Sequence, residues 1–258
     1  MSSGLEPTPH SPLSHSSHPS HVHLPQSPSR PRTLFQRVVE FAGIRRLNLK
    51  AYRDHVRDHY DGPAGAMLHL ASIASLHEPL VGRLLRKQRI NVSGRKSILD
   101  IGAGAGQILK HLLTLADADA NLIAIDLSTQ MLVRARRRMR STRPHYVAAD
   151  MTRLPFADGA FDCVTCGWVM EYQLDPRPAL REIGRVLQPG GSLYMLATED
   201  TFQGAFNSRT WKCRTFNRAE LRQACEECGL PWSQQIYFTR LHKALRAGGI
   251  IFEARKEA

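Results

Sequence analysis

The stretch that decides the fold is Ile98-Leu-Asp-Ile-Gly-Ala-Gly-Ala-Gly-Gln107. It begins as an apolar segment interrupted by Asp100, which is typical of a buried strand, and continues into the glycines Gly102, Gly104 and Gly106. Glycines permit a tight turn and let a ligand approach the main chain closely. Because a helical pattern follows directly, the turn would also present free N–H groups at a helix N-terminus. The stretch therefore predicts a strand, a ligand-binding glycine turn and a helix.

Beyond this unit, short apolar segments alternate with amphipathic ones along the rest of the chain. Apolar runs bounded by turn residues predict strands, and apolar positions three or four residues apart predict helices. The expected strands are residues 98–101, 122–125, 146–148, 163–166, 192–197, 234–238 and 250–253, and the expected helices are residues 107–115, 129–140, 179–187 and 218–227. This alternation favours an α/β fold, in which βαβ units build a parallel sheet with helices on both faces.

The first 90 residues are expected to form two parts outside this sheet. Residues 1–33 hold nine Ser, seven Pro and five of the 12 His, with almost no large apolar side chains. Such a stretch buries too little surface to offset its ordering entropy, so we expect a disordered tail; a transit peptide and loose metal binding by the His cluster are the alternatives. Residues 34–90 predict a helical N-terminal cap. Its second expected helix covers residues 66–90, and Pro79 should kink or divide that helix. Residues 91–258 then form the main domain.

Charge and cysteine content limit the partners and the compartment. The chain has 35 Lys+Arg and 23 Asp+Glu, a net charge of +12, which favours an anionic partner such as nucleic acid, a phospholipid surface or an acidic metabolite. The basic segment 34–57, and the basic loop expected at 240–246 between the last two strands, either stay solvated or rest on an anionic membrane. Five cysteines predict no disulfide framework, and no apolar run has the length of a spanning helix. We therefore expect a cytoplasmic protein, with peripheral contact as its one route to a membrane.

Two C-x-x-C pairs, Cys163/Cys166 and Cys225/Cys228, raise the question of a zinc site. Residues three apart in a strand point to opposite faces, and the two pairs lie much farther apart than the roughly 15–20 residues usual in such sites. We expect no metal site, and interpret these thiols as small buried side chains.

An acidic residue follows the glycine turn at a distance that suits a nucleotide ligand. Asp126 lies twenty residues after Gly106, at the end of the next expected strand. A carboxylate at this position can accept hydrogen bonds from both hydroxyl groups of a ribose. The dinucleotide-binding pattern G-x-G-x-x-G would need a glycine at position 107, which is Gln107, so the pattern here is D-x-G-x-G-x-G. It resembles that of the class I S-adenosylmethionine-dependent methyltransferases, especially the ubiquinone/menaquinone-biosynthesis-like (methyltransferase type 11) group. Four further blocks resemble this group in the same order: residues 125–128 with Met131, residues 149–156, residues 161–164 and residues 185–191.

The resemblance implies a Rossmann-like, doubly wound sheet of seven strands, mostly parallel with an antiparallel last strand. It also implies S-adenosylmethionine as the cofactor and a set of residues that contact it. The methionine portion would contact Asp100, Gly102, Gly104 and Gly106, and the ribose would contact Asp126. The adenine would contact Leu127, Met131, Asp150 and Met151. Cys166 would form part of the pocket wall where the fourth strand ends.

Substrate and catalytic residues are expected after the fourth strand, where this family passes the methyl group. Glu171 and Tyr172 are candidates to accept a proton or a cationic amine, and the alternative for Glu171 is a surface residue at a helix start. Trp168 and Trp211 would wall an apolar acceptor or stack on an amine. Tyr60 would cover the cofactor as an aromatic lid or, alternatively, pack in the core.

These observations predict a methyltransferase that acts by in-line displacement on a small-molecule or lipid-like acceptor, such as an aminolipid or a quinone precursor. An RNA methyltransferase is one alternative, since arginines crowd residues 134–143. Nucleic-acid amino-methyltransferases of this fold usually carry Asn/Asp-Pro-Pro-aromatic after the fourth strand, whereas this chain has Cys166-Gly-Trp-Val169. A non-catalytic protein that binds S-adenosylmethionine for regulation is the other alternative. The sequence does not predict the acceptor atom or the oligomeric state.

Overall fold

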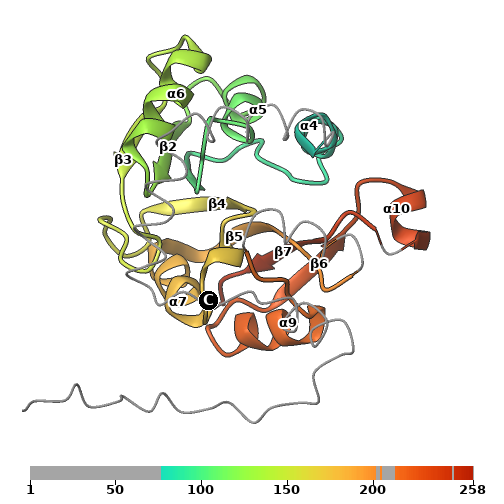
Figure 1. Cartoon of the computed structure of the whole chain (residues 1–258). Helices are drawn as coiled ribbons and strands as arrows, with labels where there is room; N and C mark the ends of the chain where they lie inside the picture. Colours follow the sequence, from blue (N-terminus) through green and yellow to red (C-terminus); the bar gives the residue numbers. More distant parts are fainter. Residues whose placement is uncertain (1–76, 202–203, 205–212, 246, 258) are drawn as a thin grey trace, which may run out of the picture. The chain divides into compact units, whose positions relative to one another are not determined.

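The computed structural model of the chain describes residues 77–201, 204, 213–245 and 247–257 (Figure 1). The expected tail at 1–33, the basic segment 34–57, Tyr60 and Trp211 lie outside the described residues. None of the described helices is both long and apolar enough to cross a membrane.

A sheet of seven strands forms the centre of the described fold, in the order β3-β2-β1-β4-β5-β7-β6. The strands are β1 (Ser97–Ile101), β2 (Asn121–Asp126), β3 (His145–Ala148), β4 (Phe161–Gly167), β5 (Leu187–Ala197), β6 (Trp232–Ile236) and β7 (Ile250–Arg255). β1 to β5 pair in parallel, and β7 runs antiparallel between β5 and β6. The predicted α/β fold, mostly parallel with an antiparallel last strand, is confirmed.

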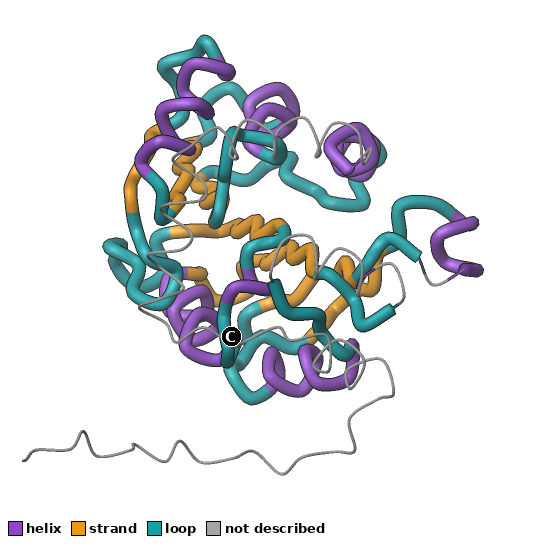
Figure 2. Tube along the Cα trace, viewed as in Figure 1, coloured by secondary structure: helices purple, strands orange, loops and turns teal. Residues whose placement is uncertain are grey.

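Helices cover both faces of this sheet (Figures 1 and 2). On one side lie α4 (His77–Arg86), α5 (Leu109–Leu115) and α6 (Thr129–Met139), and on the other lie α7 (Arg177–Val186) and α9 (Arg218–Glu226). A single 3-10 turn, η1 (Met170–Tyr172), follows β4. Residues 240–245, which the sequence suggested were a basic loop, form the short helix α10 (Arg240–Leu245) between β6 and β7.

The two faces of the sheet bury separate cores because side chains alternate along each strand. Ile98 and Cys163 pack into the core beneath α4 and α5, whereas Leu99, Val164 and Cys166 pack into the core beneath α7 and α9. Cys163 and Cys166 therefore point to opposite faces, as their spacing in a strand predicted. Both thiols are fully buried and free.

The parallel register brings the carboxyl ends of four strands to one edge of the sheet. Ile101 at the end of β1 pairs with Ile125 in β2 and with Cys166 in β4, and Asp126 pairs with Ala148 in β3. In open α/β sheets this edge is the usual place for a ligand. The glycine turn, Asp126, Asp150 and the segment after β4 all follow these strand ends, so the fold gathers most of the predicted site at one edge.

Candidate functional site

Asp100 lies near the carboxyl end of β1 with only 1% of its surface exposed. The Thr165 hydroxyl, on the neighbouring strand β4, donates a hydrogen bond of 2.7 Å to Asp100 Oδ1. Asp100 Oδ2 is equally buried and has no hydrogen-bond partner among the described residues. Burial raises the pKa of the Asp100 carboxyl from 3.8 to about 7, against the lowering effect of the Thr165 hydrogen bond, and the nearby charge of Asp126 raises it further. The site thus holds a carboxyl group poised to lose its proton near neutral pH.

The glycine turn after β1 takes backbone conformations that other residues rarely adopt. Gly102, Gly104 and Gly106 have φ angles of +68°, +52° and +86°. A Cβ atom on Gly102 would lie 2.6 Å from the Cβ of Val169, in the segment after β4. Glycine is therefore required at 102 for two reasons, the positive φ and the close approach of the neighbouring segment.

Asp126 joins the glycine turn to the start of α6. Its Oδ2 accepts a hydrogen bond of 2.9 Å from the Gly104 N–H, and its Oδ1 accepts one of 2.9 Å from the Ser128 N–H. Ser128 in turn caps α6, since its hydroxyl oxygen accepts from the Met131 N–H at 3.2 Å. Leu127 is partly buried between them, and Met131 is buried beside Gly104. The carboxylate is thus held in a fixed position between two strand ends.

Asp150 and Met151 follow β3 at the same edge. The Oδ1 atom of Asp150 accepts hydrogen bonds from the Thr152 N–H at 2.9 Å and from the Thr152 hydroxyl at 2.8 Å. Met151 is buried in the core beneath α7. These contacts stabilise a turn that places a carboxylate two strands away from the glycine turn.

The segment after β4 combines strain with aromatic packing. Trp168 has a φ angle of +52°, which is unusual for a residue other than glycine, and its N–H donates to the Leu196 carbonyl at 2.8 Å. Its ring lies 4.9 Å from the ring of His77 at the start of α4. Just before it, Cys166 is fully buried, and burial raises the pKa of its thiol well above the ordinary value. Cys166 is therefore an unreactive thiol that fills space.

Glu171 is buried, which rules out the alternative of a surface residue. Only 3% of it is exposed, and Glu171 Oε1 accepts hydrogen bonds from the Thr198 N–H at 2.7 Å and from the Thr198 hydroxyl at 2.8 Å. Its Oε2 is buried without a hydrogen-bond partner among the described residues, and burial raises the pKa of the carboxyl from 4.5 to about 7. Tyr172, next to it, is partly exposed. Glu171 thus ties the segment after β4 to the end of β5.

Sequence reasoning missed the two threonines that hold these carboxyl groups. Thr165 meets Asp100 because the two residues are paired across β1 and β4. Thr198 meets Glu171 because β5 ends beside the segment after β4. A sequence pattern gives the strands but not the register between strands that are 65 residues apart in the chain, so no local signal marks these partners.

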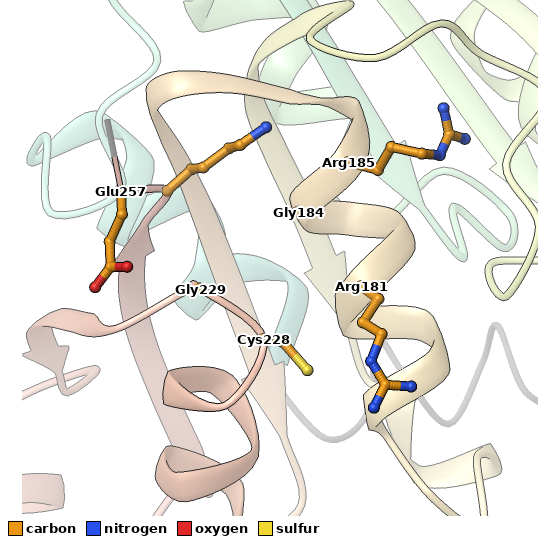
Figure 3. A pocket seen from close by; sticks show the side chains of 7 residues that line it. Arg181, Gly184, Arg185, Cys228, Gly229 and Glu257 are labelled. Carbon is orange, nitrogen blue, oxygen red and sulfur yellow. The ribbon is translucent and has the colours of Figure 1, made fainter.

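A different feature, an open pocket of about 330 Å³, lies at the opposite edge of the sheet (Figure 3). It is lined by residues of α7, the turn after α9 and the end of β7: Arg181, Gly184, Arg185, Cys228, Gly229, Lys256 and Glu257. Arg185 already donates to Glu182, to Asp158 and to the carbonyls of Leu154 and Phe156. The pocket is separate from the predicted cofactor edge, and Arg185 in its lining has a structural role.

Comparison with known proteins identifies the family of the chain. Residues 99–195 match the family model described as a methyltransferase domain. The demethylmenaquinone methyltransferase of Mycolicibacterium gilvum is 30% identical over 165 residues, which cover 64% of this chain and 69% of that protein. The ubiquinone/menaquinone biosynthesis C-methyltransferase UbiE of Vibrio cholerae is 33% identical over 123 residues, covering 45% of this chain and 47% of that enzyme. The chain thus spans about half the length of this relative.

Solved structures agree with the fold. Magnesium protoporphyrin IX methyltransferase from Synechocystis, solved with bound SAH, superposes with a TM-score of 0.62 at 16% identity, covering 80% of this chain and all of that one. A putative methyltransferase from Haloferax volcanii, solved with its Trm112 activator, superposes with a TM-score of 0.61 at 21% identity. The match covers 79% of this chain and 98% of that one.

The fold is that of the class I S-adenosylmethionine-dependent methyltransferases. Within this class, the chain belongs to the methyltransferase-domain family that includes the ubiquinone and menaquinone C-methyltransferases, as the five sequence blocks predicted. The cofactor of this family is S-adenosylmethionine.

Proposed function

We propose that the protein transfers the methyl group of S-adenosylmethionine, by in-line displacement, to a small-molecule or lipid-like acceptor of the quinone-precursor or aminolipid type. The observation that carries this proposal is the arrangement at the carboxyl edge, where a glycine turn with positive φ, a fixed carboxylate on β2 and a buried carboxyl group without a cation lie together. We further propose that the protein works in the cytoplasm.

The described residues fit such a cofactor. S-adenosylmethionine carries an ammonium group and a sulfonium, and Asp100 offers a buried oxygen that no described residue satisfies. Gly102 and Gly104, which follow this carboxyl group in the chain, are partly exposed, and without a side chain their backbone allows a ligand to approach closely. In the proposal, Asp100 and the turn bind the methionine portion, and Asp126 binds the ribose. Leu127, Met131, Asp150 and Met151 bind the adenine.

Methyl transfer from this cofactor requires few catalytic groups on the protein. When bound, the cofactor supplies a methyl group on a sulfonium that is already a good leaving group. The chain has to bind it, align the acceptor and exclude water. Where the acceptor atom arrives protonated, a group with a pKa near the working pH is suited to take the proton. Glu171 fits this requirement, since its pKa is about 7, and Tyr172 lies next to it. We propose Glu171 as the proton acceptor.

A lipid-like acceptor is favoured by the relatives and by the side chains near the edge. One of the relatives quoted above is named as a ubiquinone/menaquinone biosynthesis C-methyltransferase, and the other as a demethylmenaquinone methyltransferase. In this chain, the Trp168 ring next to the strand end, packed on His77, offers an apolar wall for a ring or an alkyl chain. Tyr60 and Trp211, both outside the described residues, are proposed to complete the substrate site.

The proposal is tested with methyl-labelled cofactor. Purified full-length protein is incubated with an extract of the host cell, and the products are separated into lipid, nucleic acid, protein and small molecules. Label in the organic phase is the expected result. Label among the small molecules would support methyl transfer to a soluble small-molecule acceptor, which the proposal includes. Label in RNA would overturn it in favour of an RNA methyltransferase. Bound cofactor with no label in any fraction would favour the non-catalytic alternative.

A further inference from the structure

The connection between β6 and β7 carries an exposed apolar surface. Its helix α10 buries none of its residues, and Leu241 and Leu245 are 64% and 67% exposed. These leucines are four residues apart, so they lie on the same face of the helix. Only two other large apolar side chains of the described part, Val133 and Leu174, are exposed, and both less so. Figure 1 shows α10 projecting away from the sheet and its covering helices.

The same connection is basic and holds no acid. Residues 237–249 contain Arg240, Lys243 and Arg246 but no Asp or Glu. Arg240 and Lys243 are exposed, and neither forms an ion pair within the described part of the chain. Exposed leucines beside unpaired cations are the combination that favours the interface of an anionic bilayer, where the apolar side chains enter and the cations meet the headgroups.

Topology places this surface at the functional edge. β7 is antiparallel to both β5 and β6, so β6 runs parallel to β5 and ends at the same edge. The connection begins there after Ile236 and returns at Ile250, which pairs with Ala197 at the end of β5. A Cβ atom on Gly249 would lie 2.6 Å from the Ala197 carbonyl oxygen, which shows how closely the returning chain approaches β5.

A row of rings connects α10 to the segment after β4. The His242 ring, on α10, lies 5.6 Å from Phe238 and is bonded to the Thr239 hydroxyl at 2.7 Å. Phe238 lies 6.3 Å from His77, whose ring is 4.9 Å from Trp168. His242 therefore contacts the body of the protein, while Leu241 and Leu245 of the same helix stay exposed.

We propose that α10 docks the protein on an anionic phospholipid surface, with Leu241 and Leu245 inserted and Arg240 and Lys243 on the headgroups. The docked helix places the carboxyl edge, where the cofactor binds, next to the bilayer from which a lipid-like acceptor is drawn. This second point rests on the proposed function; the docking itself does not.

The test is co-sedimentation of the full chain with vesicles, without cofactor or acceptor. We expect strong binding to vesicles of phosphatidylcholine mixed with phosphatidylglycerol, and weak binding to phosphatidylcholine alone. The double variant Leu241→Asp/Leu245→Asp should lower the partition coefficient about tenfold or more. The variant Arg240→Glu/Lys243→Glu should remove the preference for the anionic vesicles, since each cation near such a surface contributes about fivefold. Val133→Asp/Leu174→Asp is the matched control, with the same charge change elsewhere, and should bind as the unmodified chain.

Several results would overturn the docking. Unchanged binding of Leu241→Asp/Leu245→Asp, in a protein whose thermal unfolding is unaltered, would assign the contact to another segment. Absence of binding by the unmodified chain would exclude it as well. Concentration-dependent self-association that only the α10 variant abolishes would identify a second copy as the occupant. Because no methyl transfer is measured, failure of the docking leaves the labelling experiment untouched, and a failed labelling experiment leaves the docking untouched.

Discussion

Replacing Asp100 by Asn tests whether the carboxyl group beneath the glycine turn is neutral or charged. Asn keeps the shape and can still accept the hydrogen bond from the Thr165 hydroxyl, so the replacement mainly removes the ability to ionise. The pKa of this carboxyl is 3.8 in an ordinary setting and about 7 in the folded chain, because burial penalises the charged form. The folded protein therefore holds a proton that the unfolded chain releases.

The sign and the size of the effect on the free energy of unfolding follow from this difference in pKa. Below pH 3.8 the group is protonated in both states and costs nothing. As the pH rises from 3.8 to about 7, the unfolded chain gains by ionising while the folded chain does not, so the free energy of unfolding falls. The full cost is about 4 kcal/mol above pH 7, and about 3 kcal/mol of it develops between pH 5 and pH 8. Asn at this position leaves an amide N–H without a partner, which is a cost that does not depend on pH.

Urea unfolding of both proteins without cofactor, at several pH values from about 5 to 8, measures the effect. The unmodified chain should lose about 3 kcal/mol more of its free energy of unfolding over this range than Asp100→Asn does. Glu171 titrates in the same range, but it is present in both proteins and cancels in the comparison. A difference between the two proteins that stays constant with pH would mean that Asp100 is ionised throughout, and the reasoning from burial would be wrong.

The same carboxyl group should make cofactor binding depend on pH. If it pairs with a cationic group of the cofactor, it has to lose its proton first, so affinity should rise about tenfold per pH unit up to pH 7 and then level off. Calorimetric titration of Asp100→Asn should give weaker binding without this rise. An identical pH dependence in the two proteins would place the cation elsewhere.

Three further predictions concern the same edge. Asp126→Ala removes the carboxylate that holds the Gly104 N–H, and calorimetry should detect no cofactor binding; normal affinity would refute the placement of the ribose. Glu171→Gln should lower kcat with little change in KM and abolish the limb of the pH–rate profile near 7, whereas an unchanged profile would exclude Glu171 as the proton acceptor. Gly102→Ala should cost about 3 kcal/mol of unfolding free energy, and Gly94→Ala, at a similar φ but with nothing within 4 Å, about 1 kcal/mol; equal losses would show that the close approach at 102 has no effect.

The sequence predicted the sheet well because its signals are local. A strand and a glycine turn follow one another within residues 98–107, the helix α5 begins shortly after at Leu109, and similar units recur along the chain. Boundaries were less exact where a turn-forming sequence is part of a strand. β5 begins at Leu187 and runs through Pro189-Gly-Gly191, which the sequence pattern placed outside the strand. Neighbouring strands extend pairing beyond the residues whose own preferences favour it.

The environment of the site residues was harder to predict because it depends on contacts between distant segments. Glu171, between Met170 and Tyr172, has no pattern that distinguishes a buried acid from an exposed one, and its burial comes from Thr198 and the core beneath α7. The helix α10 was missed for a related reason. It has six residues and buries none of them, and so short an apolar pattern, Leu241 and Leu245 alone, does not distinguish a helix from a loop.

The buried acids themselves distinguish a binding edge from the rest of the fold. Four carboxyl groups are buried among the described residues, and two of them have arginine partners: Glu78 with Arg138 at 2.6 Å and Glu253 with Arg255 at 3.1 Å. Asp100 and Glu171 each accept a hydrogen bond from a threonine on one oxygen, and the other oxygen has no hydrogen-bond partner within the described part of the chain. The charge of Arg214 lowers the pKa of Glu171, but Arg214 forms its ion pair with Glu220. Burying a carboxyl group without a counter-ion costs stability, and a fold tolerates that cost where a ligand later repays it. Asp100 lies in the carboxyl half of β1 and Glu171 in the turn after β4, at the edge where a cationic cofactor would bind. The arrangement is therefore better explained by ligand binding than by the needs of the fold, and the pH dependence of Asp100→Asn measures it directly.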